Sequence, residues 1–137
     1  MSQKLLEIRV DARPDQLKTL RDAVRNCLEG CGAGEQCTRD VVMAVDEACQ
    51  NIIRHAYRGD PNGTILLAID QRGDDLIFSL HDDAPTVDPA TVKPRDLEDL
   101  RPGGLGTHLI AEVMDEARFV PQPDATGNLF RMVKRIR

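Results

Sequence analysis

Residues 41–57 read VVMAVDEACQNIIRHAY, and the architecture of the chain can be built outward from this segment. Its apolar side chains recur at spacings of three and four residues, which is the period of a helix with one buried face. The members of this apolar line are Val41, Val45, Ala48, Ile52 and Ala56. Together with the residues that precede it, the segment predicts one long helix from about Glu35 to Tyr57.

The flanking sequence alternates between strand-like and helix-like patterns. Residue-by-residue alternation and turn-forming residues predict strands at Leu6–Val10, Thr64–Asp70, Asp75–Asp82, Ala117–Pro121 and Asn128–Ile136. A helix of about 15 residues is expected to begin near Asp11 or Arg13, and another is expected over Leu105–Met114. This order predicts an α+β fold, a two-layer α/β sandwich whose mostly antiparallel mixed sheet is covered on one face by three helices.

Composition narrows the function classes. The chain has 137 residues, 41% hydrophobic and 30% charged, which fits a single folded domain over residues 1–137. A net charge of −5, with three Phe, one Tyr and no Trp, disfavours direct binding to nucleic acid or to an anionic membrane. No apolar run is long enough to cross a membrane, and the first residues do not resemble a signal peptide. The expected location is therefore cytoplasmic.

The four cysteines do not predict a metal site. Cys27, Cys31, Cys37 and Cys49 match no common zinc-binding spacing, and a cytosolic disulfide is not expected. Cys27 and Cys31 share a helix face with leucines. They are therefore interpreted as small hydrophobic residues.

Two polar residues lie beside the apolar line of the long helix. Glu47 and Asn51 are four residues apart, so their side chains are neighbours on one face. Such a pair at the border of a core is often no more than a solvated flank. The alternative is a functional acid and amide, and the helix alone leaves both interpretations open.

Asp82 continues an apolar row. Leu76, Phe78 and Leu80 point to one face of the predicted strand, and Asp82 occupies the next position on that face. A buried carboxylate needs a partner, because burying an unpaired charge is costly. It can cap the start of the following loop, or it can accept a hydrogen bond from an amino group of a ligand such as a purine.

A long loop and a glycine cluster follow. Residues 83–104 contain four prolines and several acids, and are interpreted either as a solvated insertion or as a lid over a site. The cluster Gly103-Gly104-Leu105-Gly106-Thr107 then begins a helix, whose free N–H groups suit a phosphate. It is not a Walker A loop, because the Gly-Lys-Ser/Thr ending is absent.

These three segments together resemble a known family. Residues 41–57 resemble the N-box of the GHKL ATPase and kinase superfamily, most closely that of the small bacterial anti-sigma-factor serine kinases. Residues 82–89 resemble the Asp-x-Gly-x-Gly box of these kinases, and residues 103–106 resemble their glycine-rich second box. The resemblance extends over about residues 6–134 and implies the Bergerat ATP-binding fold.

The resemblance implies a role for each matched residue. Asn51 would hold Mg²⁺ at the phosphates, Glu47 would be the base for the attacking hydroxyl, and Asp82 would bind the adenine amino group. The other residues of the implied ATP site are Ala84, Gly103, Gly104, Leu105, Gly106 and Thr107, beneath a lid of about residues 88–104. Mg²⁺ prefers hard oxygen ligands, which an Asn carbonyl supplies. His55 and Tyr57 are expected to be structural.

The implied function is that of a Mg-ATP-dependent serine kinase in a partner-switching system. Such a protein, with ATP and Mg²⁺ as cofactors, binds a sigma factor or another regulator and phosphorylates a STAS-type antagonist. The resemblance also implies a homodimer. Ala84 and Thr86 stand where the family commonly has glycine, so a regulator that acts by contact alone, with a weakened nucleotide site, is an alternative. An ATP hydrolase is a further alternative.

Overall fold

The computed structural model describes residues 2–58, 60, 62–84, 106–122 and 126–136. The strands are β1 (Ser2–Asp11), β2 (Thr64–Arg72), β3 (Asp75–Asp82), β4 (Glu116–Val120) and β5 (Asn128–Arg135). The α-helices are α1 (Leu17–Gly30), α2 (Glu35–Asn51) and α4 (Gly106–Val113). A 3₁₀ turn, η1 (Pro14–Gln16), precedes α1, and a π-helical turn, η2 (Ile52–Ala56), follows α2.

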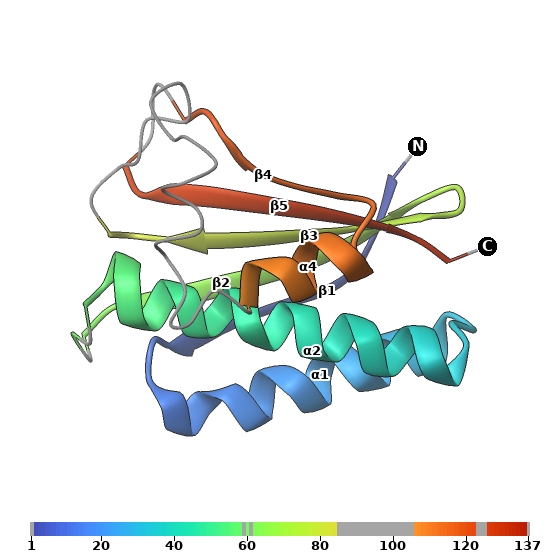
Figure 1. Cartoon of the computed structure of the whole chain (residues 1–137), viewed down its shortest axis with the longest axis horizontal. Coiled ribbons are helices and arrows are strands. Elements are labelled where there is room, and N and C mark those ends of the chain that lie inside the picture. The colour runs from blue at the N-terminus through green and yellow to red at the C-terminus, as the bar shows by residue number, and fades with distance from the viewer. Residues whose placement is uncertain (1, 59, 61, 85–105, 123–125, 137) are drawn as a thin grey trace.

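The described strands form one sheet in the order β1-β2-β3-β5-β4. Every neighbouring pair is antiparallel, so the described sheet lacks the parallel component that a mixed sheet would have. Helices α1, α2 and α4 lie on the same side of this sheet (Figure 1). The fold is therefore the predicted two-layer α/β sandwich, with helices on one face.

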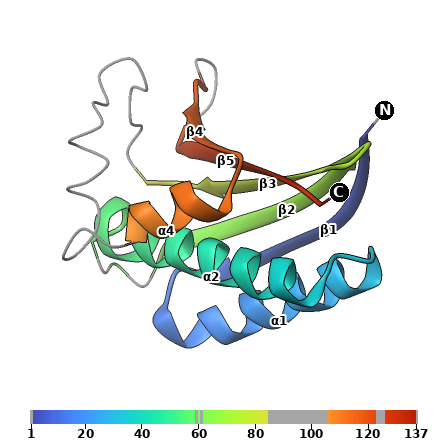
Figure 2. The same cartoon turned by 45° about the vertical axis from the view of Figure 1, so that its right-hand side comes forward.

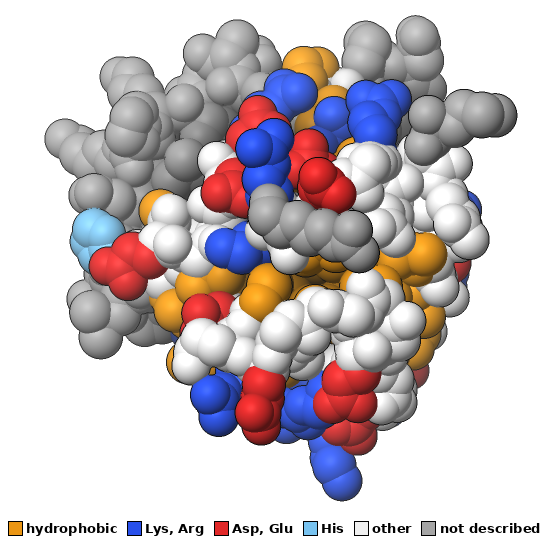
Figure 3. All heavy atoms as spheres, turned by 90° about the vertical axis from the view of Figure 1, so that its right-hand side faces the viewer, with side chains coloured by type: hydrophobic (Ala, Val, Ile, Leu, Met, Phe, Trp, Pro, Cys, Tyr) orange, Lys and Arg blue, Asp and Glu red, His pale blue; other side chains and the backbone are white. Residues whose placement is uncertain are grey.

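The turned view also shows the two layers (Figure 2), and the core lies between them. Alternate residues of β2, β3 and β5 point toward the helices, and Leu67, Phe78 and Met132 are fully buried there. The apolar line of α2 packs against this face, with Val41 fully buried, and α1 contributes Leu20, Val24 and Leu28. Apolar side chains are visible between the layers when the molecule is viewed from the end that carries the termini (Figure 3).

The predicted helix over residues 35–57 differs from the structure at its end. The α-helix ends at Asn51, and residues 52–56 continue as a π turn, in which the Tyr57 amide donates to the Ile52 carbonyl at 3.0 Å. A π turn inserts one extra residue into the helix and rotates the side chains that follow it. Such turns are frequent at functional sites, and this one directly follows Asn51.

The cysteines pack against the core, as the sequence predicts for Cys27 and Cys31, although Cys31 is the C-cap residue just after α1. Cys27, Cys31 and Cys37 are half-buried against the core, and Cys49 is fully buried. Burial raises the pKa of the Cys27, Cys37 and Cys49 thiols, which keeps them protonated. Within the described ranges, no group of three His, Cys, Asp or Glu side chains could hold a metal. No helix in the described part of the chain could span a membrane.

Candidate functional site

Asp82 is a buried carboxylate at the end of β3. Strand alternation places it on the helix-facing side, where it is 3% exposed. Its Oδ1 accepts hydrogen bonds from the Ala84 amide and from Asn128 Nδ2, both at 3.0 Å. Burial raises the pKa of Asp82, and these two hydrogen bonds act in the opposite direction. Both of these bonds reach Oδ1, and no described residue donates a hydrogen bond to Oδ2.

Two neighbours of Asp82 were not predicted from the sequence. Asn128 lies directly opposite Asp82 on β5 and is itself buried. Gly127 has a φ of +87°, and a Cβ at this position would overlap the Asp82 carbonyl oxygen, so glycine is required there. The sequence indicated only a turn and the start of a strand at these positions. The register of β3 with β5 is what gives them their role.

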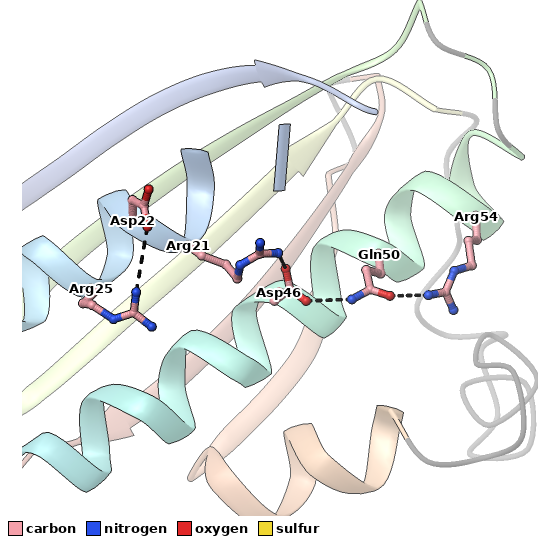
Figure 4. A network of polar contacts seen from close by, with 6 residues as sticks. All are labelled: Arg21, Asp22, Arg25, Asp46, Gln50 and Arg54. Carbon is pink, nitrogen blue, oxygen red and sulfur yellow. Dashed lines mark hydrogen bonds and ion pairs between the residues drawn. The ribbon is translucent and has the colours of Figure 1, made fainter. Parts of the chain in front are cut away.

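A chain of polar contacts runs along the C-terminal part of α2 (Figure 4). Arg21 of α1 donates from Nη1 to Asp46 Oδ1 at 2.9 Å, and Gln50 Nε2 donates to Asp46 Oδ2 at 2.6 Å. Arg54 in turn donates to Gln50 Oε1. These contacts join α1, α2 and η2, and they satisfy both oxygens of Asp46.

Glu47 follows Asp46 in the helix, and Asn51 follows Gln50. Unlike Asp46 and Gln50, these two side chains lack polar partners among the described residues. No described residue forms a hydrogen bond or an ion pair with the half-buried Glu47 side chain. The Asn51 Oδ1 atom is buried and has no hydrogen-bond partner. An unpaired buried acceptor is costly in a folded protein and calls for an explanation. The hard amide oxygen of Asn51 suits a magnesium ion that arrives with a phosphate ligand.

His55 adds a third unpartnered group to this end of the helix. Its Nε2 atom is buried without a hydrogen-bond partner, although the sequence assigned His55 a structural role only. Burial, and to a smaller extent Arg54, lowers the pKa of His55, so its ring is neutral at neutral pH. His55 lies within the π turn, four residues after Asn51. The contacts of the described residues therefore do not account for this nitrogen.

Tyr57 holds the end of the helix against the end of β3. Its hydroxyl donates to the Thr64 carbonyl at 2.7 Å and accepts from the Asp83 amide at 2.6 Å and the Thr64 amide at 3.3 Å. A Cβ on Gly63 would overlap the Tyr57 ring, so the ring lies directly on the backbone of the turn that precedes β2. The structural role expected for Tyr57 is confirmed. Its contacts bring the Asn51 end of the helix toward Asp82.

We expect Tyr57→Phe to lower the free energy of unfolding by about 1–2 kcal/mol, because the ring still packs but three hydrogen bonds are lost. Nucleotide affinity should also fall, since the helix end and the Asp82 end of β3 are no longer held together. Thermal unfolding and calorimetry would measure the two effects. Thr64→Val is the matched control, because it removes only the exposed Thr64 Oγ1 bond to Asp83. Equal losses in both variants would contradict this role of Tyr57.

The remaining predicted residues are only partly described. Ala84 is buried, and its amide orders Asp82. Gly106 and Thr107 lie in the first turn of α4, whose N-terminal N–H groups are suited to a phosphate. Gly103, Gly104, Leu105 and the predicted lid over residues 88–104 lie outside the described residues. The end of β3, η2 and the start of α4 lie at the same end of the molecule (Figures 1 and 2).

The sheet is antiparallel and covered by helices on one face. The second helix carries unpaired acid and amide side chains, and a buried Asp lies at a strand end. These features place the protein in the class of GHKL-type α/β sandwiches. The chain belongs to the family described as the histidine kinase-like ATPase domain, whose model matches residues 10–134.

Several similar proteins bear the name serine-protein kinase RsbW. The Staphylococcus aureus protein is 27% identical over 95% of this chain and 87% of its own length. The Bacillus subtilis protein is 30% identical over 82% of this chain and 76% of its own length. The Bacillus licheniformis protein is 26% identical over 96% of this chain and 88% of its own length. The predicted resemblance to serine kinases of this group is confirmed.

A solved structure supports the fold. The crystal structure of the RsbU and RsbW domains of Rv1364c from Mycobacterium tuberculosis matches 96% of this chain with a TM-score of 0.68 and 22% identity. This chain spans 31% of that longer protein. At this identity the match establishes the shared sandwich and its topology.

Proposed function

We propose that this protein is a Mg-ATP-dependent serine kinase of the partner-switching type. It would bind a sigma factor or another regulator and phosphorylate a serine of a STAS-type antagonist. The observation that carries the proposal is the unpaired state of Glu47 and Asn51 beside the fully paired Asp46. The names of the relatives support the same reaction.

Each requirement of phosphoryl transfer can be assigned to described residues. Asp82 Oδ2 would accept a hydrogen bond from the adenine amino group, and the unpartnered Asn51 Oδ1 would bind Mg²⁺. The ion would neutralise charge on the phosphates. Glu47 would accept the proton of the serine hydroxyl as its oxygen attacks the γ-phosphorus and the bond to the β-phosphate oxygen breaks. The N–H groups of the first turn of α4, with Gly106 and Thr107, would contact the phosphates.

The serine hydroxyl is proposed to come from another protein. A carboxylate base suits an alcohol nucleophile, whose proton must leave during the attack. A docked antagonist would supply this hydroxyl and exclude water from the site, so that transfer to the serine is favoured over ATP hydrolysis while the antagonist is bound.

The test combines the protein, labelled Mg-ATP and STAS-domain proteins from the same organism, followed by a search for acid-stable phosphoserine. We expect the label on one of these proteins and little free phosphate without it. Rapid phosphate release without any partner would instead indicate an ATP hydrolase. Tight partner binding without transfer, with ATP bound, would indicate a regulator that acts by contact alone.

A further inference from the structure

Two arginines face each other on the side of the sheet away from the helices. Arg118 of β4 and Arg131 of β5 are directly paired in register, and strand alternation directs both to this outer face. Like charges directly opposite each other destabilise a strand pair. No described residue forms an ion pair or hydrogen bond with either side chain, and the Arg131 Nε atom is buried without a partner. The neighbouring Arg135, in contrast, pairs with Asp75 at 3.6 Å.

These arginines line a depression of about 160 Å³ on the outer face. Ile77 and Val133, which are direct partners across β3 and β5, form its apolar part. Arg72 and Asp75 lie at the end away from the arginine pair, and Glu116 lies beside Val133. The depression therefore combines two arginines that lack ion-pair partners among the described residues with an apolar surface, and two carboxylates flank it. No described helix covers this face (Figure 1).

We infer that this depression, the outer-face pocket, binds an acidic segment of a partner protein, with a carboxylate between Arg118 and Arg131 and an apolar side chain over Ile77 and Val133. A carboxylate matches the planar donor fork of arginine and would satisfy the buried Nε. Inorganic phosphate would leave the apolar part unused. A nucleic-acid backbone would likewise leave the apolar part, Ile77 and Val133, unused. This surface is on the opposite side of the sheet from the proposed nucleotide site and independent of it.

The test uses a short capped peptide of alternating glutamate and leucine, titrated into the ¹⁵N-labelled full chain without nucleotide. We expect the amide signals of Ile77, Arg131 and Val133 to shift together. Arg118→Glu should weaken peptide binding by about tenfold or more, because it replaces attraction with repulsion. Arg118 is exposed, so the fold should tolerate the change, and Arg131→Gln provides a second, milder variant.

Arg9→Glu is the matched control. Arg9 is exposed on the outer face of β1, away from the outer-face pocket. Reversing its charge should therefore have little effect on peptide binding. Equal weakening by Arg9→Glu would reduce the effect to overall charge and overturn the inference. Equal binding of a glutamine–leucine peptide, or of inorganic phosphate at the same amides, would also overturn it. The inference would also be overturned if the protein dimerised at high concentration and Arg118→Glu abolished the dimer, because the occupant would then be a second copy of this chain.

Discussion

Replacing Glu47 with glutamine is expected to lower phosphoryl transfer by about 100-fold or more, while ATP still binds. The amide keeps the size of the side chain and can still form hydrogen bonds, but it cannot accept the proton of an attacking hydroxyl. No described residue pairs with Glu47, so the substitution breaks no contact of the folded chain. Binding and chemistry should therefore separate, with a large loss of rate and an affinity close to that of the original protein.

Single-turnover transfer from labelled ATP to the serine acceptor would measure this rate, and calorimetry would measure binding of Mg-ATP. Glu29→Gln makes the same change at an exposed position on α1 and should leave both values unchanged. If Glu47→Gln retained full activity, Glu47 would be a structural residue. If it abolished ATP binding, the carboxylate would act on the ligand rather than on the acceptor.

Local sequence patterns were sufficient to predict the layers of this fold. The apolar line through Val41 and Val45 follows the helix period closely, and both side chains are buried. The row that ends at Asp82 follows the strand period, which is why the burial of this carboxylate could be predicted. These patterns depend on residues close together in the chain. They carry the information that a single sequence expresses most directly.

The parts that could not be predicted depend on contacts between distant segments. Asn128 bonds to a carboxylate 46 positions away, and Arg21 reaches Asp46 across 25 positions. Only these contacts show that Asp46 is fully paired, whereas Glu47 is not. The π turn after Asn51 has no sequence pattern of its own, because its apolar residues fit an α-helix equally well. Consequently, the unpartnered nitrogen of His55 became evident only from the structure.

Asp82→Asn is expected to lower ATP affinity by about 10- to 100-fold, the range for a lost hydrogen bond to a charged group. The oxygen of the new side chain can still accept from the Ala84 amide and Asn128 Nδ2. Its NH₂ group then occupies the position of Oδ2 and presents a donor to the adenine amino group, which is also a donor. The variant should therefore lose ATP affinity while it keeps the contacts of residue 82 with Ala84 and Asn128.

The same substitution should not destabilise the protein without nucleotide. Burial raises the pKa of Asp82, so the charged form is less favourable in the folded chain than in the unfolded chain. The contribution of this group to stability therefore decreases as the pH rises through the folded-state pKa. At neutral pH, Asp82→Asn removes this unfavourable charge. The melting temperature of the variant should therefore equal or exceed that of the original protein. Thermal unfolding at neutral and acidic pH would measure the difference.

The pH dependence of binding should distinguish Asp82 from its neighbour. ATP affinity should fall as the pH is lowered toward the raised pKa of Asp82, because protonation weakens the acceptor for the adenine amino group. In Asp82→Asn this contribution should be absent. Asp83→Asn is the matched control, because Asp83 is exposed and its carboxylate accepts from Thr64 Oγ1 rather than from Asn128. Unchanged ATP affinity in Asp82→Asn would remove Asp82 from the site, whereas equal losses in both variants would show only a general effect of negative charge.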